Sequence, residues 1–267
     1  MIHRKLLLSP GLYLYAAGTL LLGVVGLVTG DFATNWQHVG AGVAHRTVLA
    51  YATAAFELVA GAALLWRRSA RVAAGALAGF YCIFVLLWLP AAVAAPKVYD
   101  SWGNVFEELS LVIAGVAAFA WLAPPESAWA RRAGVIARAY GICAISFGVD
   151  HLVYLRGVAG FVPKWIPPGG MFWALTTAIS FLMAAAAMLS GILAGLASRL
   201  LGVMIVLFWG LIWVPSLIAS PRTHFLWSAN GMALVLGGGA WVAADVIRAT
   251  RARRQGEEAV VAGRSAA

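Results

Sequence analysis

Long apolar segments are the feature that most constrains this chain. Eight segments of about 20 residues recur along its 267 residues. A helix needs about 20 predominantly apolar residues to cross the roughly 30 Å hydrocarbon core of a bilayer. The predicted spans are residues 11–29, 47–66, 72–89, 105–122, 136–154, 172–190, 200–217 and 229–247. The sequence therefore predicts an all-α integral membrane protein with eight transmembrane helices.

Composition agrees with this fold class and excludes an ordinary soluble protein. Hydrophobic residues make up 63% of the chain and charged residues only 11%, whereas soluble domains carry about 45–50% and about 25%. The 19 Lys and Arg residues outnumber the 10 Asp and Glu residues, which in a soluble chain would suggest a nucleic-acid partner. Here the basic residues lie between apolar segments, where they direct membrane orientation. We expect the lipid bilayer as a partner and no nucleic acid.

The basic residues are divided unequally between the two sides of the predicted spans. One side has fourteen of them: Arg4, Lys5, Arg67, Arg68, Arg71, Arg131, Arg132, Arg138, Arg199, Arg248, Arg251, Arg253, Arg254 and Arg264. The other side has five: Arg46, Lys97, Arg156, Lys164 and Arg222. Because cytoplasmic connections carry an excess of Lys and Arg, this division predicts that both termini are cytoplasmic.

An internal repeat is found when the chain is compared with itself at an offset of 125 residues. The pattern W-x-P-x5-P-[KR]-x4-W occurs at residues 88–102 and again at 213–227. Further pairs at this offset are Tyr15 with Tyr140 and Phe56 with Phe181. The pattern itself is best explained as a structural corner, because Trp and Pro are common at span ends. Each half holds four spans, an even number, so we expect two four-helix bundles in the same orientation, a parallel repeat.

The repeat also predicts the domain boundaries. The two four-helix units are residues 1–123 and 136–247, joined by a cytoplasmic linker at 124–135. A basic cytoplasmic tail follows at 248–267 and is rich in Glu, Gly and Ala beyond its Arg residues. We expect this tail to be a frayed segment held weakly at anionic headgroups, or a plain topology anchor.

The second half resembles a known family. It contains Asp150, His151 and Tyr154, then Val-Pro at 162–163 and Trp-Ile-Pro at 165–167 ahead of the repeated corner. These residues resemble the DoxX and DoxD-like membrane proteins, which are four-helix units. The resemblance is best over the second half and weaker over the first, so the chain looks like two fused units.

The resemblance implies a function as well as a fold. The family includes membrane subunits of a thiosulfate:quinone oxidoreductase and of thiol-linked or oxidative-stress complexes. The chain thus looks like a DoxX-like subunit of a quinone- or thiol-linked redox system in a bacterial inner membrane, working with a soluble redox partner protein. The resemblance assigns no catalytic residue.

Ionisable residues inside the predicted spans are the candidate functional residues. Each costs about 2.5–3.5 kcal/mol on insertion scales and usually faces the bundle interior. Glu57 is predicted near the bilayer midplane, facing protein and within reach of a polar group from another span. The candidates for ligand binding or proton transfer are Glu57, Glu107, Asp150, His151, Arg156 and Arg222. We expect an outward-facing cavity with Glu57 at its floor and the other five around its mouth.

Structural roles for the same residues stay open. Long side chains at helix ends, such as those of Glu107, Arg156 and Arg222, often extend to water at the interface. Glu57 could instead make a structural interhelical hydrogen bond. Asp150 and His151 are adjacent on a helix and do not face each other, so an ion pair would need a partner on another span.

Several cofactor sites are absent from the sequence. Only His151 lies within a predicted span, which argues against a bis-histidine haem. No dinucleotide-binding GxGxxG, Walker loop or HExxH is present, the two Cys residues form no CxxC, and no metal site is predicted. We expect no intrinsic haem or flavin and consider a quinone the candidate cofactor. A proton-coupled transporter of a small solute and a structural or assembly subunit remain alternatives.

Overall fold

The computed structural model describes residues 9–265 and, within them, contains helices and connections without strands. Eight of its helices are long and apolar enough to cross a membrane. Both observations confirm the predicted all-α membrane fold. The elements are α2 (Pro10–Thr29), α3 (Arg46–Leu64), α4 (Ala70–Ala94), α5 (Tyr99–Trp121), α6 (Ala128–Arg138), α7 (Tyr140–Val153), α8 (Leu155–Phe161), α9 (Gly170–Ser190), α10 (Ala194–Phe208), the π-helix η1 (Trp209–Trp213), α11 (Val214–Ala219) and α12 (His224–Ser265).

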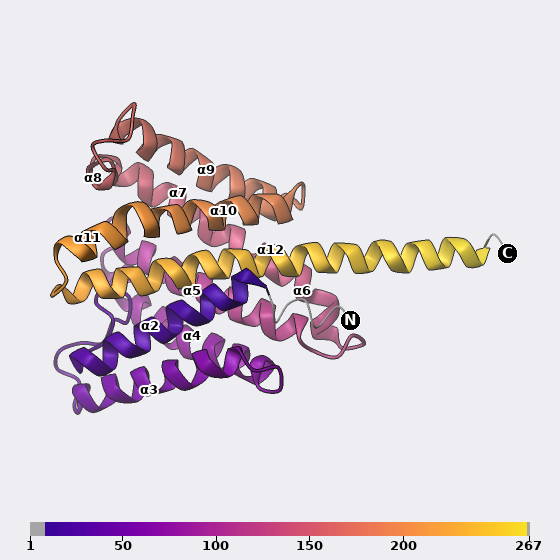
Figure 1. The fold of residues 1–267 in the computed structure, drawn as a ribbon, viewed down its shortest axis with the longest axis horizontal. Coiled ribbons are helices and arrows are strands. Elements are labelled where there is room, and N and C mark those ends of the chain that lie inside the picture. The colour runs from indigo at the N-terminus through magenta and orange to yellow at the C-terminus, as the bar shows by residue number, and fades with distance from the viewer. Residues whose placement is uncertain (1–8, 266–267) are drawn as a thin grey trace.

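Two spans are built from more than one element. The fifth combines α6 and α7, so α6 occupies most of the predicted linker, and the seventh combines α10, η1 and α11. The short helices α8 and α11 lie at one end of the bundle, called here the α8 end, whereas α12 projects from the opposite tail end (Figure 1).

The predicted basic side of the protein corresponds to the tail end. The α3–α4 and α9–α10 connections and the projecting part of α12 lie there (Figure 1). Arg4 and Lys5 of the predicted basic set lie outside the described residues, as does the side chain of Arg264. Which end faces the cytoplasm stays a prediction.

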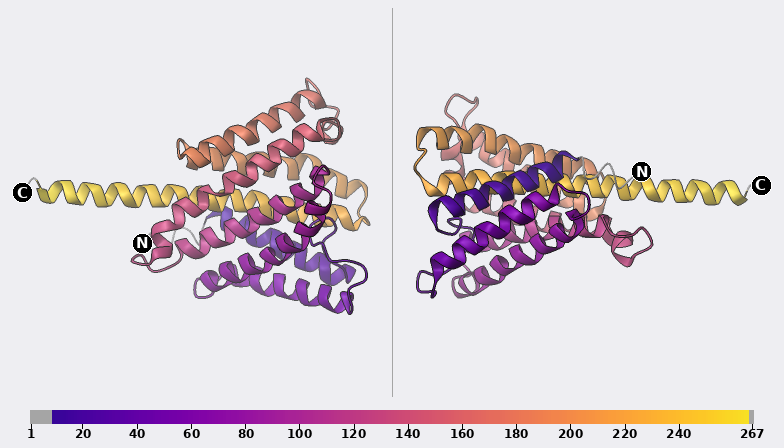
Figure 2. Two further views of the ribbon diagram at one scale, coloured as in Figure 1. Left: turned by 180° about the vertical axis from the view of Figure 1, so that it is seen from behind. Right: turned by 60° about the horizontal axis from the view of Figure 1, so that its bottom comes forward.

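The two halves of the chain are interlocked. Within each half, the first span packs on the second and the third packs on the fourth, as α2 does on α3 and α4 on α5, and as α7 does on α9 and α10 on α12. Between the halves, α2 packs along α12 and α5 packs against α6 and α7. The first span of each half therefore packs against the last span of the other half (Figures 1 and 2).

One hydrogen bond recurs in both halves. The Tyr15 hydroxyl donates to the Leu111 carbonyl at 3.0 Å. The Tyr140 hydroxyl donates to the Leu236 carbonyl at 2.8 Å. Both members of the second pair lie 125 residues after those of the first. This contact agrees with the predicted parallel repeat, whose overall symmetry stays a prediction.

The offset between the halves is not constant along the chain. The six buried residues of α3 lie 124 residues before the six buried residues of α9. The five buried residues of α10 likewise follow buried residues of α4 by 124. At this offset Phe181 in the second half corresponds to Glu57 in the first half. The ungapped comparison at 125 instead pairs Phe181 with Phe56.

The π-helix η1 restores the offset of 125. A π-helical turn inserts one extra residue into an α-helix. Before η1 the third spans of the two halves match at an offset of 124, and at the last residue of η1 Trp88 matches Trp213 at an offset of 125. An ungapped sequence comparison does not reveal this insertion, because the matched corner begins only at the last residue of η1.

The tail differs from its prediction. Helix α12 has 42 residues, about 63 Å at 1.5 Å per residue, and it continues to Ser265 where a frayed segment was expected (Figure 2). Between Arg248 and Ser265 the sequence has no Pro and is rich in Ala, Arg and Glu, which are strong helix formers. The helix also packs on α6, and Arg253 donates to the carbonyl of Pro125, in the connection before α6, at 3.0 Å.

Candidate functional site

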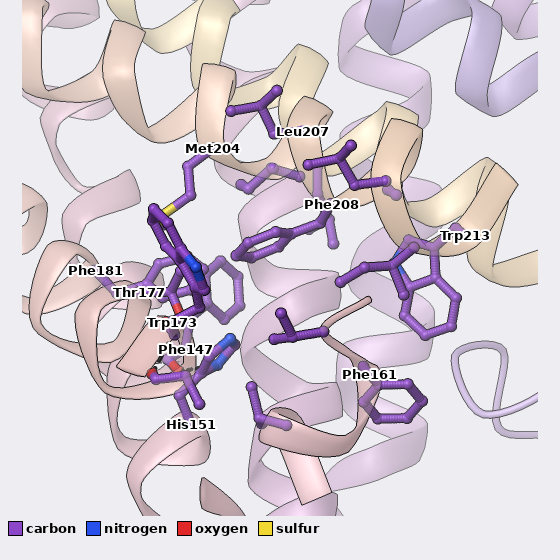
Figure 3. A pocket seen from close by; sticks show the side chains of 18 of the residues that line it. Phe147, His151, Phe161, Trp173, Thr177, Phe181, Met204, Leu207, Phe208 and Trp213 are labelled. Carbon is purple, nitrogen blue, oxygen red and sulfur yellow. Dashed lines mark hydrogen bonds between the residues drawn. The ribbon is translucent and has the colours of Figure 1, made fainter. Parts of the chain in front are cut away.

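A cavity of about 500 Å³ lies in the second half of the chain, toward the α8 end. Its walls come from α7, α8, α9, α10, η1 and α12, and the first half contributes Trp36, Gly103 and Glu107. Binding sites for small molecules typically measure about 300–1,000 Å³. The cavity is therefore large enough for a ring-containing ligand (Figure 3).

The cavity wall is mainly aromatic and aliphatic. Seven aromatic residues other than His151 line it: Trp36, Phe147, Phe161, Trp173, Phe181, Phe208 and Trp213. Trp36 comes from the α2–α3 connection, and the other six come from α7, α8, α9, α10 and η1. Figure 3 shows these six around the cavity. Aromatic faces favour planar ring systems, which stack on them or meet their edges.

His151 is the polar centre of this wall. Its ring lies 4.9 Å from the Phe181 ring and 6.1 Å from the Phe208 ring, nearly parallel to the latter at 22°. Its Nδ1 lies 2.9 Å from the Phe147 carbonyl. Because a carbonyl only accepts hydrogen bonds, this contact requires a proton on Nδ1, which leaves Nε2 of a neutral ring as an acceptor.

Two carboxyl groups line the same cavity. Glu107 Oε2 accepts a hydrogen bond from Trp36 Nε1 at 2.5 Å. Asp150 lies beside Gly103, where an added methyl group would be 3.3 Å from its Oδ1. Among the described residues that line the cavity there is no Lys or Arg. The titratable groups among the lining residues are thus one imidazole and two carboxyl groups, and neither Lys nor Arg accompanies them.

The six predicted site residues fall into two groups. Glu107, Asp150 and His151 line the cavity together. Arg156 on α8 and Arg222 between α11 and α12 are exposed and are not among the lining residues, and neither is Glu57. The expectation of one cavity with Glu57 at its floor is therefore wrong.

Glu57 belongs to a separate buried region in the first half. It is 1% exposed, so it faces protein as expected. Its Oε1 accepts a hydrogen bond from Gln37 Nε2 at 2.8 Å. The bonded partner lies in the α2–α3 connection, and not in another span as the sequence predicts.

The connections of the two halves explain why the aromatic cavity lies in the second half. The α2–α3 and α7–α9 connections both have 16 residues, 30–45 and 154–169. The first folds inward, so that Phe32, Trp36 and Gln37 are at most 7% exposed. No residue of the second is buried. The first connection fills the interior of its own half, and the second stays at the rim.

Glu108 is a buried residue that was not selected as a site candidate. It is 0% exposed, and neither carboxyl oxygen has a hydrogen-bond partner among the described residues. A helical signal identifies it, because the buried positions of α5 include Asn104, Glu108, Leu111 and Gly115 at the 3.6-residue period. Its neighbour Glu107 points instead into the cavity.

Comparisons of the chain with protein-family models, with curated proteins and with solved structures find no match. Among the described residues, no group of three or more His, Cys, Asp or Glu side chains is arranged to hold a metal ion. The function is therefore argued from the cavity itself. Its wall can hold a planar ring, and its three titratable groups can exchange hydrogen bonds or protons with polar atoms on that ring.

Proposed function

We propose that this protein is the ligand-binding membrane subunit of a quinone-linked redox system and that the cavity holds the quinone ring. The observation that carries this proposal is the position of His151 between aromatic rings, in one cavity with Glu107 and Asp150. The resemblance to DoxX-like proteins supports the same class. It also supports a place in a bacterial inner membrane and a soluble partner that supplies electrons.

The chain's own residues would bind the ring and handle protons. A bound quinone supplies two-electron, two-proton redox chemistry. Phe181 and Phe208 fix the plane of the His151 ring, and the bond from Nδ1 to the Phe147 carbonyl fixes its tautomer. Neutral His151 then accepts a hydrogen bond at Nε2 from a ligand hydroxyl, and its protonated form donates one to a ligand carbonyl. Asp150 and Glu107 lie in the same wall to pass protons to or from it.

The proposal predicts that His151→Ala weakens quinone binding about tenfold. The variant loses one hydrogen bond, and a loss of about 1.4 kcal/mol raises the Kd by a factor of about ten. Quenching of tryptophan fluorescence measures the affinity, because Trp36, Trp173 and Trp213 line the cavity. Arg156→Ala is the matched control, since Arg156 is exposed outside the cavity. If the purified protein binds no quinone, or if both variants bind as the wild type does, the redox proposal fails.

One observation favours a second candidate, a proton-coupled transporter of a lipophilic cation. The described cavity lining has two carboxyl groups, many aromatic faces and no Lys or Arg, and aromatic faces attract cations. The same fluorescence titration with tetraphenylphosphonium distinguishes the two. Tight binding of the cation, lost in Asp150→Asn, together with no response to quinone would favour transport. Binding of neither compound would favour the structural-subunit alternative.

A further inference from the structure

We infer that the cavity opens sideways into the bilayer, between α9 and α10, and that its ligand carries a long hydrocarbon tail that leaves through this opening. The opening is called here the lateral seam and is defined by Ser180 on α9 and by Met204 and Leu207 on α10. The identity of the ring in the cavity rests on the proposed function. The seam itself rests on a comparison of the two halves.

The matching seam of the first half is closed by two aromatic rings. Phe56 on α3 and Phe80 on α4 stack with their centroids 4.6 Å apart and their planes at 30°. At the offset of 124 residues that superposes the buried positions of these helices, Phe56 corresponds to Ser180 and Phe80 to Met204. In the second half, the small residue Ser180 and the flexible residue Met204 therefore occupy the positions of the two stacked rings.

Both replacements line the cavity. Ser180 and Met204 are partly exposed and belong to the cavity wall. The Ser180 hydroxyl bonds to the Thr176 carbonyl of its own helix at 2.8 Å, so it needs no partner across the seam. The position at which the first half is closed is thus a point of access in the second half.

Leu207 shows that the cavity reaches the outer surface of the bundle. It lines the cavity and is 52% exposed. It is the fourteenth residue of the 26-residue seventh span, Ala194–Ala219, so its exposed surface lies near the middle of the membrane and meets hydrocarbon chains. Figure 3 shows Met204 and Leu207 together on one side of the cavity.

The α8 end of the cavity is covered by aromatic side chains. The Phe161 ring of α8 lies 5.7 Å from the Trp213 ring of η1, so this contact joins the two helices. Trp213 lies 6.0 Å from Phe225, and Phe225 stacks on Trp36 at 5.7 Å and 9°. This row of rings lines the α8 end of the cavity, whereas the exposed side chain of Leu207 lies on the lipid-facing side. A ligand with a polar ring and an apolar tail matches both features.

Closing the seam with the rings of the first half tests this inference. In Ser180→Phe together with Met204→Phe, the equilibrium affinity for a quinone with a ten-carbon tail should fall at least tenfold, because the tail loses its exit. The affinity for the same ring with a methyl group instead of the tail should fall several-fold less, because that ligand has no tail to pass through the seam. The matched control is Ser180→Ala with Met204→Leu, which keeps the seam free of rings. Equal loss or equal retention of both ligands in the double-Phe variant would overturn the inference.

A second measurement tests the seam without any quinone. A nitroxide label is attached at Ser180→Cys in a Cys82→Ser background, where the remaining Cys143 is buried. We expect the label to collide with lipid-dissolved oxygen more than with a water-soluble nickel chelate, and the reverse at Lys164→Cys in the exposed connection. Preference for the chelate at position 180 would overturn the seam. A lipid-accessible label in a protein that binds neither quinone would support the seam while the proposed function fails.

Discussion

At the scale of single residues, two buried glutamates in the first half have opposite surroundings. The Glu57 carboxyl accepts a hydrogen bond from Gln37, whereas both oxygens of Glu108 lack a partner among residues 9–265. Burying a polar group without a hydrogen bond costs free energy, and removing one member of a bonded pair leaves the other unsatisfied. The two residues should therefore respond differently to the same replacement.

Replacement by Met, a flexible apolar residue of similar length, makes this difference measurable. We expect Glu108→Met to raise the free energy of unfolding by about 1–3 kcal/mol, because it removes an unsatisfied buried carboxyl. Glu57→Met should lower it by a similar amount, because the Gln37 amide loses its acceptor. Thermal unfolding in detergent measures both, and each variant is the control for the other. A loss of stability in Glu108→Met would show that its carboxyl has a favourable interaction.

At the scale of elements, the π-helix η1 distinguishes the seventh span, which lines the cavity, from α4, the matching span of the first half. Leu211, Ile212 and Trp213 belong to η1 and line the cavity, and no residue of η1 is buried. The matching part of α4 is a continuous α-helix that buries Phe84, Val85 and Trp88. One inserted residue thus changes which side chains the seventh span presents to the cavity.

Deleting Gly210 should convert η1 into a continuous α-helix. Gly210 is exposed, and a methyl group there would meet nothing within 4 Å. We expect the variant to fold, as α4 does without the insertion, but to bind the cavity ligand at least tenfold more weakly because Leu211 to Trp213 rotate by about 100° per residue removed. Deleting Leu86 from α4 is the matched control and should unfold the protein, because it rotates a buried face. Circular dichroism and fluorescence titration measure the two effects. Unchanged ligand binding after deletion of Gly210 would remove η1 from the site.

At the scale of the whole molecule, the interlocked halves make one bundle. Helix α2 packs along α12 and α5 against α7, so each half completes its packing with the other. The helices approach each other closely at Gly238, where a methyl group would lie 2.2 Å from the Tyr15 backbone nitrogen. Such proximity of two helices is possible only without a side chain at that position.

The orientation of this bundle is predicted from charge alone. The connection at residues 65–69 contains Arg67 and Arg68, and the positive-inside rule places it in the cytoplasm. In intact cells, Lys164→Cys should react with a membrane-impermeant thiol reagent and Arg67→Cys should not, both in a Cys82→Ser background. After the membrane is permeabilised, both should react. The opposite labelling pattern would invert the proposed topology.

The sequence is sufficient to predict the eight helices, because a long apolar segment in lipid must satisfy its own backbone hydrogen bonds whatever surrounds it. It also identified Glu107, Asp150 and His151, because titratable residues within apolar spans are visible without a structure. The number of these titratable residues and their depth in the membrane follow from their positions along the spans. These are local properties of the chain.

Only the tertiary structure decided which of these residues share a site. Glu57 was separated from the cavity because the connection at 30–45 folds inward and fills the first half, whereas the equally long connection at 154–169 stays outside. The direction in which a connection folds depends on the space that neighbouring helices leave, and hydropathy along the chain does not contain that information. The same holds for the change of offset at η1 and for the lateral seam, which depend on how four helices pack against one another.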